Sequence, residues 1–412
     1  TNIGSLHGKQ LITVEDLKTN NQLHAVQQAM VDCHGSQCGF CTPGFVMSMF
    51  ALRKNNATSD PHKTIESLGG NLCRCTGYKP IIEAANQSFE SPCDDQFSAQ
   101  HDNDVEQLKR INQQYPSAHL IHLDKQFFSP STADELAKLL LEYPKARLLA
   151  GGTDLCLEFT QFLRDAQILI HTGRVKDLAT VELNDKSLVL GAAVTYSHAA
   201  DQLIALYPDL KELIERLGSL QVRNQATIAG NIGNASPIGD MPPVLIALGA
   251  ELVLRKGDER RTIPIEDYFI KYKVTALQTS EFIESIIIPR PDSLADFKTY
   301  KISKRLEDDI SATCGAFNIQ IEQGAVSAVK IAFGGMAEIP KRARHCERAL
   351  LNQPWSNESI ERAKIELKKD FSPISDFRAS ADYRLDVSQN MLNRLYLQLE
   401  SDSQTIRVTQ YA

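Results

Sequence analysis

The sequence of 412 residues lacks the features of a membrane protein and of a nucleic-acid-binding protein. Its longest apolar stretch, Val244 to Leu254, is too short to span a bilayer and contains Glu251. Its net charge of −7 disfavours nucleic acid or an anionic membrane surface as the main partner. A secretory signal and an initiator Met are also missing, so we expect a cytoplasmic protein whose chain began earlier.

Two common chemical motifs are absent as well. The ten histidines form no H-E-x-x-H pattern, and no expected strand is followed by the G-x-G-x-x-G of a Rossmann dinucleotide site. The sequence therefore supports neither a histidine metal site of that kind nor a Rossmann dehydrogenase.

The residues that are present have the composition of a globular protein, with 42% hydrophobic and 23% charged residues. A chain of this length exceeds one ordinary core, so we expect roughly two to four domains. Most of the nine cysteines fall in the first quarter, and in a long chain such clustering favours metal ligation or redox chemistry over disulfides. The clustered cysteines are Cys33, Cys38, Cys41, Cys73, Cys75 and Cys93. The scattered ones, Cys156, Cys314 and Cys346, are interpreted as small buried hydrophobes.

The spacing of apolar residues divides the chain into parts. Residues 10 to 90 have helical periodicity, whereas the stretch after Ser91 is polar and typical of a linker or a surface-draped segment. Strand and helix patterns then alternate up to about Pro291, and a small α+β unit follows. Strands are expected at 148–150, 168–170, 188–190, 317–321 and 326–333, and helices at 136–143, 204–217, 357–369 and 387–400. The expected domains are 1–90, a linker at 91–115, 116–291 and 292–412.

Two close cysteine pairs, Cys38-Gly39-Phe40-Cys41 and Cys73-Arg74-Cys75, are separated by roughly thirty residues. Four thiolates can hold either a structural zinc or an iron–sulfur cluster, and the spacing alone leaves both open. The C-x-C pair is less common in zinc sites, and the nearby glycines let backbone N–H groups approach inorganic sulfur. Cys33, Cys38 and Cys41 also fit the C-x4-C-x2-C of plant-type ferredoxins, but that interpretation needs a β-rich surround and this one is helical.

Two glycine-rich segments in the middle of the chain are candidates for ligand-binding loops. In the first, residues 148–155, a strand runs into Gly151-Gly152, whose consecutive N–H groups can face a pyrophosphate. The second, residues 227–243, is rich in Gly, Pro and Asn, which suits close approach to a polar ligand. For both, an ordinary turn or connecting loop is the competing interpretation, and the residues alone do not name the ligand.

The cysteine motifs resemble the helical [2Fe–2S] domain of the xanthine dehydrogenase and aldehyde oxidase family. The resemblance is carried by Gly35-Ser-Gln-Cys-Gly-Phe-Cys-Thr-Pro-Gly44 and Gly70-Asn-Leu-Cys-Arg-Cys-Thr-Gly-Tyr78. It implies that Cys38, Cys41, Cys73 and Cys75 hold the cluster and that Cys33 is a bystander. In this family a second, ferredoxin-like [2Fe–2S] domain normally comes first. We therefore expect a second cluster on a domain that is missing here.

The glycine-rich segments resemble the FAD domain that this family shares with the medium subunits of carbon monoxide dehydrogenases, a domain of the vanillyl-alcohol-oxidase type. By this resemblance residues 147–155 wrap the pyrophosphate, residues 227–231 face them, and Asp240 and Lys301 lie near FAD. Leu217 and Ile283 fall at apolar contact positions, although a core role is the alternative. The implied cofactor-binding residues are Arg147, Leu148, Leu149, Ala150, Gly151, Gly152, Thr153, Asp154, Leu155, Leu217, Thr227, Ile228, Ala229, Gly230, Asn231, Asn234, Asp240, Ile283 and Lys301.

Near the carboxyl end, Phe333-Gly-Gly-Met-Ala337 resembles the family's C-terminal flavoprotein domain. The expected fold is therefore multidomain α+β. It consists of a helical [2Fe–2S] domain, then a vanillyl-alcohol-oxidase-type FAD domain of α/β texture, then a small α+β C-terminal flavoprotein domain.

The resemblance also implies a function. An iron–sulfur cluster passes single electrons, NAD accepts a hydride, and a flavin interconverts the two. We expect the chain to be the FAD and iron–sulfur subunit of an oxidoreductase of the xanthine dehydrogenase family. It would pass electrons from a molybdopterin-binding large subunit through [2Fe–2S] and FAD to NAD, as hypoxanthine and xanthine become urate in purine catabolism. We expect a heterotetramer with two copies of each subunit, and no residue of this chain acting as acid, base or nucleophile on the purine.

Three alternatives stand beside this interpretation. The first is the same role in a related molybdenum hydroxylase acting on an aldehyde, an aromatic acyl-CoA or carbon monoxide, although fusion of the cluster and FAD domains favours the xanthine type. The second is a zinc-stapled, cofactor-free interaction protein, which would be colourless. The third is a stand-alone flavin reductase. Tyr272 is one candidate for a ring that faces NAD, although an ordinary role is favoured. Asp308 and Asp309 are weighed as flavin-tuning charges against solvated surface charges, the role we favour.

Overall fold

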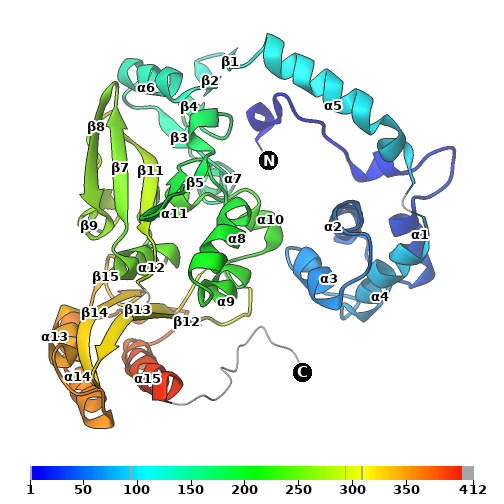
Figure 1. Cartoon of the computed structure of the whole chain (residues 1–412). Helices are drawn as coiled ribbons and strands as arrows, with labels where there is room; N and C mark the ends of the chain where they lie inside the picture. The colour runs from blue at the N-terminus through cyan, green and yellow to red at the C-terminus, as the bar shows by residue number, and fades with distance from the viewer. Residues whose placement is uncertain (1, 93, 293, 308–309, 401–412) are drawn as a thin grey trace. The chain divides into compact units, whose positions relative to one another are not determined.

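The computed structural model describes residues 2–92, 94–292, 294–307 and 310–400 (Figure 1). The predictions made for Cys93, Asp308 and Asp309 lie outside these residues. The chain divides into two units, Thr1–Ala118 with Ser219–Val222, and His119–Gly218 with Arg223–Ala412. Each unit is described by itself.

The first unit is helical, as the periodicity predicts. Phe45, Met49 and Ile81 lie at the centre of its core, each at most 1% exposed. Three of its helices have a proline in the first turn, where the missing N–H leaves no hydrogen bond unmade. The elements are η1 (Ile3–Leu6), η2 (Val14–Leu17), α1 (Ala25–Asp32), α2 (Thr42–Asn55), α3 (Pro61–Leu68), α4 (Lys79–Gln87), η3 (Ser88–Glu90) and α5 (Gln96–Gln114).

The polar stretch predicted as a linker, residues 91–115, is mostly the helix α5. This helix has 19 residues and none of them is buried, so the low hydrophobicity of the stretch belongs to a solvent-exposed helix. The prediction missed the helix because a helix without a wide apolar face gives a weak periodic signal. The remaining signal was Asp95, whose side chain accepts a hydrogen bond of 2.9 Å from the Ser98 N–H and begins the helix.

Asp95 also joins α5 to the rest of the first unit. Its carboxylate lies 2.6 Å from Lys54 Nζ on α2 and 3.1 Å from His24 Nε2 at the start of α1. Burial alone would raise the pKa of Asp95, but the donors Lys54, Ser98 and His24 outweigh it and lower that pKa to about 2. The ionised carboxylate therefore stabilises the position of the first turn of α5.

The second unit begins with a sheet in the order β1-β2-β4-β3, in which β2, β4 and β3 are parallel. The parallel pairs are joined through helices, as parallel strands require. The strands are β1 (Ala118–His122), β2 (Lys125–Ser129), β3 (Arg147–Leu149) and β4 (Ile168–His171), and α6 (Ala133–Glu142) and α7 (Leu155–Thr160) flank β3 in sequence.

An antiparallel sheet in the order β5-β6-β11-β7-β8 follows. Its strands are β5 (Val181–Leu183), β6 (Ser187–Gly191), β7 (Glu251–Lys256), β8 (Glu259–Pro264) and β11 (Phe282–Pro289), with a hairpin of β9 (Phe269–Lys271) and β10 (Val274–Thr275). Between β6 and β7 the second unit has the helices α8 (Tyr196–Leu206), α9 (Leu210–Glu215), α11 (Ile228–Gly233) and α12 (Met241–Leu248). The short helix α10 (Leu220–Arg223) also falls here in the sequence, but its first three residues belong to the first unit. The two short turns η4 (Lys176–Leu178) and η5 (Ile265–Asp267) complete this part.

The last part of the chain is a meander in the order β12-β13-β14-β15 with three helices. Its α13 contacts β14 and its α15 contacts β13 (Figure 1). The elements are β12 (Ala295–Ile302), β13 (Thr313–Glu322), β14 (Ala325–Gly334), β15 (Lys341–Arg342), α13 (Arg344–Leu350), α14 (Asn357–Asp370) and α15 (Ala381–Glu400).

Helix α12 connects the antiparallel sheet with the meander. All eight of its residues are buried, and it contacts β11, β13 and β14. A helix that is apolar on every side needs neighbours on every side, and these strands supply them. The hydrophobic core around α12 consequently extends from the antiparallel sheet to Cys314, Ala316 and Ala332 of the meander, which also has a core of its own.

Most of the strands and helices predicted for the second unit are found. The exception is the single helix predicted over 204–217, which is two helices, because α8 ends at Leu206 and α9 begins at Leu210. Pro208 lies between them, and proline cannot donate the N–H that a continuous helix needs. Cys314 and Cys346 are buried as predicted, whereas Cys156 is only half-buried. No helix in the described part of the chain is both long and apolar enough to cross a membrane.

We predict that Asp95→Asn reduces the stability of the first unit by about 2 kcal/mol at pH 7, because asparagine can still cap α5 but cannot pair with Lys54. The pKa of Asp95 is lowered from 3.8 to about 2 on folding, so this contribution is present above about pH 4 and is lost as the pH falls toward 2. At pH 3 the difference between the two proteins should be about half as large.

The difference in unfolding free energy between the variant and the parent is measured by urea unfolding at both pH values, with amide hydrogen exchange in α5 as the local probe. Asp102→Asn, an exposed change on the same helix, is the control and should have little effect at either pH. A difference between Asp95→Asn and the parent that does not change between pH 7 and pH 3 would contradict the assignment.

Candidate functional site

The two cysteine motifs come together at helix ends in the first unit. Cys41 is the residue before α2, and Cys73 and Cys75 lie in the loop between α3 and α4. The Cys75 thiol hydrogen-bonds to Cys38, and the Cys41 thiol hydrogen-bonds to Cys73, so each pair takes one cysteine from each motif. The four predicted ligands are therefore close together in space.

Cys33 lies outside this group of thiols. Its Sγ donates a hydrogen bond of 2.7 Å to Oε1 of Gln87, the last residue of α4, and not to one of the four thiols. The alternative set with plant-type ferredoxin spacing, which would use Cys33, is not assembled in this way.

Hydrogen-bond donors surround the sulfurs, and they change the acidity of the thiols. Thr76, through its hydroxyl 3.2 Å from the Cys73 sulfur and then through its backbone N–H, lowers the pKa of Cys73 to about 7. The Phe40 N–H is the main group that lowers the pKa of Cys38. Burial raises the pKa of Cys41, and the hydrogen bond to Cys38 raises that of Cys75. Such N–H and O–H donors are what thiolate ligands require.

The thiol pairs fit a two-iron cluster. Four thiolates suffice for [2Fe–2S], with two on each iron, whereas a single zinc needs all four around one ion. The chemistry of the donors and their arrangement as two pairs therefore favour the cluster over zinc.

The two glycine-rich segments, which are far apart in the sequence, meet in the second unit. Residues 150–154 form the turn between β3 and α7, and Gly152 adopts a φ of 73° that favours glycine. A Cβ at Gly151 would lie 1.9 Å from the carbonyl oxygen of Gln225 and 2.9 Å from the nitrogen of Ala226. The turn at residues 150–154 is therefore packed against the backbone of residues 225–226, just before Thr227. Only glycine at position 151 allows this close approach.

The second segment offers a polar group that lacks a partner. Thr227 begins α11 and accepts a hydrogen bond of 2.9 Å from the Gly230 N–H. The side-chain oxygen of Asn231 is buried and has no hydrogen-bond partner among the described residues. Because buried acceptors are rarely left unpaired, this oxygen is available to a donor from water or from a ligand. The hydroxyl and N–H groups of FAD supply such donors, so the loop fits the predicted cofactor.

Asp240 and Lys301 form an ion pair beside this loop. Lys301 Nζ lies 2.6 Å from Asp240 Oδ2, and their side chains are 1% and 0% exposed, respectively. Ser311 donates a hydrogen bond of 2.6 Å to the other carboxylate oxygen. Burial, and then the Asp240 carboxylate, raise the pKa of Tyr196, whose buried hydroxyl has no partner among the described residues.

Of the remaining predicted contact residues, two are buried in the core and the others lie at the surface or at the end of a helix. Leu217 and Ile283 are buried in the hydrophobic core, as their alternative interpretation requires. Arg147 pairs with Glu158 of α7 at 3.1 Å. Tyr272, the candidate for a ring that faces NAD, is 56% exposed beside β9. Asn234 follows the last residue of α11.

Sequence reasoning did not identify the polar residues around Asp240. Ser311, Tyr196 and the buried arginines Arg216 and Arg384 come from four separate elements or loops. No spacing in the sequence relates them to Asp240, so only the folded chain brings them together.

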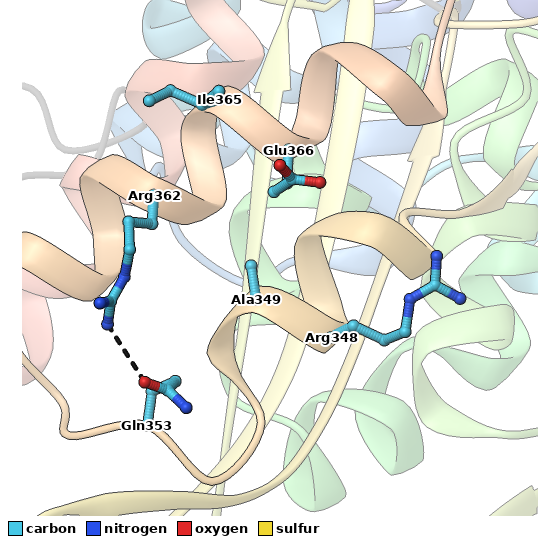
Figure 2. A pocket seen from close by; sticks show the side chains of 6 residues that line it. All are labelled: Arg348, Ala349, Gln353, Arg362, Ile365 and Glu366. Atoms are coloured by element: carbon cyan, nitrogen blue, oxygen red, sulfur yellow. Dashed lines mark hydrogen bonds between the residues drawn. The ribbon is translucent and has the colours of Figure 1, made fainter.

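A pocket between α13 and α14 contains none of the predicted residues (Figure 2). Arg362 donates a hydrogen bond of 3.2 Å to Gln353 across it, and Figure 2 shows Arg348 directed away from this pair. Its lining residues are Arg348, Ala349, Gln353, Arg362, Ile365 and Glu366. They include no nucleophile, and we assign this pocket no role.

Comparisons with known families match three domains in the order predicted. Residues 13–86 match a [2Fe-2S] binding domain, residues 123–291 match the FAD binding domain in molybdopterin dehydrogenase, and residues 298–399 match the CO dehydrogenase flavoprotein C-terminal domain. The predicted fold class and the FAD and [2Fe–2S] domains are thereby confirmed.

Similar proteins include xanthine dehydrogenases and other hydroxylases. The chain is 30% identical to xanthine dehydrogenase of Emericella nidulans over 95% of this chain and 33% of that protein. It is 29% identical to xanthine dehydrogenase 1 of Arabidopsis thaliana, over 89% of this chain and 32% of that protein. Nicotinate hydroxylase hnxS of Emericella nidulans is 27% identical, over 98% of this chain and 38% of that protein. The chain thus spans about a third of the length of the curated relatives it matches.

Solved structures agree with these matches. Carbon monoxide dehydrogenase from Hydrogenophaga pseudoflava is 26% identical with a TM-score of 0.63, covering 67% of this chain and 96% of that chain. The enzyme from Oligotropha carboxidovorans is 25% identical with a TM-score of 0.62, covering 67% and 97%. The chain therefore carries the FAD and [2Fe–2S] domains of the molybdenum hydroxylase family.

For the thiol pairs, we predict that serine at Cys38, Cys41, Cys73 or Cys75 removes the cluster, because one of the two irons would lose one of its two thiolates. Iron content should fall from about two per chain to near zero, together with the visible absorption of the cluster. Cys33→Ser is the matched control and should keep both, since Cys33 bonds to Gln87. Loss of the cluster in Cys33→Ser, with retention in Cys75→Ser, would instead support the plant-type ferredoxin set.

For the flavin loop, we predict that Gly152→Ala weakens FAD binding about tenfold or more. Gly324→Ala is a control matched in backbone strain, because Gly152 and Gly324 have φ values of 73° and 78°. Each change should destabilise the second unit by about 1 kcal/mol through backbone strain, whereas only Gly152→Ala alters the predicted cofactor loop, where its Cβ would also lie 2.8 Å from the Cys156 Sγ. Titration of the deflavinated protein with FAD measures both affinities. Equal affinities for FAD in the two variants would remove Gly152 from the site.

Proposed function

We propose that this chain is the small, electron-transfer subunit of a xanthine dehydrogenase. It passes electrons from a molybdopterin-binding partner subunit through [2Fe–2S] to FAD and then to NAD. The observation that carries this proposal is that one chain contains both a set of four paired thiols and a flavin-binding domain. When bound, the cluster exchanges single electrons and the flavin couples them to hydride transfer.

The residues of this chain would hold and tune these groups. Cys38, Cys41, Cys73 and Cys75 would bind the cluster, with Cys38 and Cys75 on the exposed side and Cys73 buried. Exposed ligands shorten the path for electrons that arrive from a partner protein. The chain would supply no acid, base or nucleophile to the purine, whose pocket we place on the large subunit.

The loops of the second unit would bind FAD. The backbone of residues 147–155 and 227–231 would hold the pyrophosphate, with the Asn231 oxygen accepting a hydrogen bond from the cofactor. Lys301 would hold its positive charge beside the cofactor, and Asp240 would keep that lysine in place. All of these proposed FAD-binding residues belong to the second unit of the chain.

The proposal extends to the assembly and the substrate. The partner is a molybdopterin-binding large subunit in a complex with two copies of each chain, and a second [2Fe–2S] cluster lies on an additional ferredoxin-like domain. The xanthine dehydrogenases among the relatives support hypoxanthine and xanthine as substrates of that complex. The likeness to nicotinate hydroxylase and to carbon monoxide dehydrogenases favours a second candidate, the same electron-transfer role beside a large subunit with another substrate.

An anaerobic visible spectrum of the purified protein before and after addition of NADH tests the relay. We predict flavin bands near about 450 nm and a broad iron–sulfur shoulder at longer wavelength, both bleached by NADH. A colourless sample with about one zinc per chain would overturn the proposal in favour of a zinc-stapled interaction protein.

The substrate is tested separately with the complex of both subunits. Xanthine should bleach the complex but not this chain alone, whereas bleaching by nicotinate or carbon monoxide and not by xanthine would support the second candidate. A chain that binds both groups but never associates with a molybdopterin subunit would instead be a stand-alone flavin reductase.

A further inference from the structure

The connection between β12 and β13 holds both groups that bond to Asp240. Lys301 is near the end of β12, and Ser311 lies just before β13. They occupy the two oxygens of one carboxylate, at 2.6 Å each. The position of both ends of residues 301–312 therefore determines whether Asp240 keeps its two partners.

One buried arginine holds the first end of this connection. Arg216 follows α9 and is 5% exposed. It donates to the carbonyl oxygens of Lys301 at 3.1 Å and Leu306 at 3.3 Å, and to the Ser303 hydroxyl at 3.2 Å. Its charge is balanced by Glu212, at 3.1 Å on the same helix.

A second buried arginine holds the other end. Arg384 of α15 is 1% exposed and donates through one nitrogen to the carbonyl oxygens of Ala312 and Gly335. Its other terminal nitrogen pairs with Asp376 at 2.8 Å. The Gly335 N–H in turn donates to the Pro237 carbonyl oxygen at 2.8 Å, three residues before Asp240. Arg384 thus contacts the connection and, through Gly335, the segment that leads to Asp240.

Burial of a guanidinium is unfavourable unless its donors are satisfied. Arg216 directs its donors to two carbonyl oxygens and a hydroxyl of the connection and to Glu212. Arg384 directs its two terminal nitrogens to Ala312, Gly335 and Asp376, and its buried Nε has no partner among the described residues. A guanidinium presents five N–H groups in a rigid plane, so it can fix several carbonyl groups at once where a lysine cannot. Arg342, in the same unit, differs from these two arginines. It pairs with the carboxylates of Glu347 and Glu266 and contacts neither end of the connection.

We propose that Arg216 and Arg384 are positioning residues of the flavin site. By fixing the two ends of residues 301–312, they keep Lys301 and Ser311 on Asp240 and hold the lysine charge against the cofactor. This inference rests on the proposed function, because it requires FAD to bind beside Asp240 and Lys301.

The test uses the full chain with FAD and the variants Arg216→Met and Arg384→Met, with Arg342→Met as the control for loss of a paired arginine. We expect each of the two test variants to bind FAD about tenfold more weakly. We also expect the flavin midpoint potential to fall by about 30 mV, the equivalent of a tenfold change in relative affinity for a two-electron couple. The potential falls because a lysine charge that moves away stabilises the reduced flavin less. Arg342→Met should leave the potential unchanged.

A second pair of variants addresses loss of folding. Arg216→Lys and Arg384→Lys keep the charge but replace three nitrogens with one, so they should give intermediate potentials in a folded protein. Amide hydrogen exchange of residues 299–307 and 310–314 in the chain without FAD should increase in all four variants and not in Arg342→Met.

The outcomes separate the two proposals. If the parent chain binds no FAD, the proposed function fails and this inference fails with it. If the parent binds FAD but the potentials of the Arg216 and Arg384 variants match that of Arg342→Met, only the positioning role is overturned. Weaker FAD binding with an unchanged potential would also overturn it, because a purely structural arginine would have that effect.

Discussion

The flavin half of this protein depends on one buried ion pair, Lys301 with Asp240, in which Nζ and Oδ2 are 2.6 Å apart and neither side chain is more than 1% exposed. Removal of two charges from water is unfavourable by several kcal/mol per ion, and a buried pair seldom stabilises a fold more than apolar residues of the same volume would. Stability alone therefore does not account for its presence here. The role proposed for Lys301, a fixed charge beside a redox cofactor, would account for it, because the interior strengthens the effect of such a charge.

The ion pair also explains why the carboxyl-terminal part belongs to the same unit as the FAD-like part. Asp240 precedes α12, while Lys301 is on the first strand of the terminal meander. The two can meet only because α12, apolar on all sides, is buried between the antiparallel sheet and the meander. The apolar packing supplies the stability, and the polar pair uses the geometry that this packing fixes.

The local parts of this arrangement were visible in the sequence, and the ligands that they would bind stay predictions. Four cysteines at fixed spacings define their own site, and Gly151 and Gly152 define a turn, because the chemistry of each depends on residues close in the chain. The fold class and the order of the domains followed from the same motifs. Helix α5 was missed because its residues face water on most sides and give no strong period. The predicted helix over 204–217 was too long because Pro208 was not weighed as a break.

The surroundings of Asp240 could not be predicted for a different physical reason. Arg384 is 144 residues from Asp240 in the chain, and its partners are carbonyl oxygens, which every residue has. A contact to backbone leaves no pattern in the side chains of its partner, so no motif marks it. An arginine in a sequence is ordinarily exposed, and only its 1% exposure distinguishes this one.

The same reasoning separates the two redox sites of the chain. Thiolate ligands must be supplied by specific side chains, so a cluster site can be read from cysteines. A flavin site is built largely from backbone N–H groups, from glycines that allow close approach, and from a few charges placed by the fold. Its residues in contact with the cofactor leave a weak motif, and the residues that hold those in place leave none. The properties of the flavin should therefore depend on positions such as Arg216 and Arg384, which resemblance to a family does not identify.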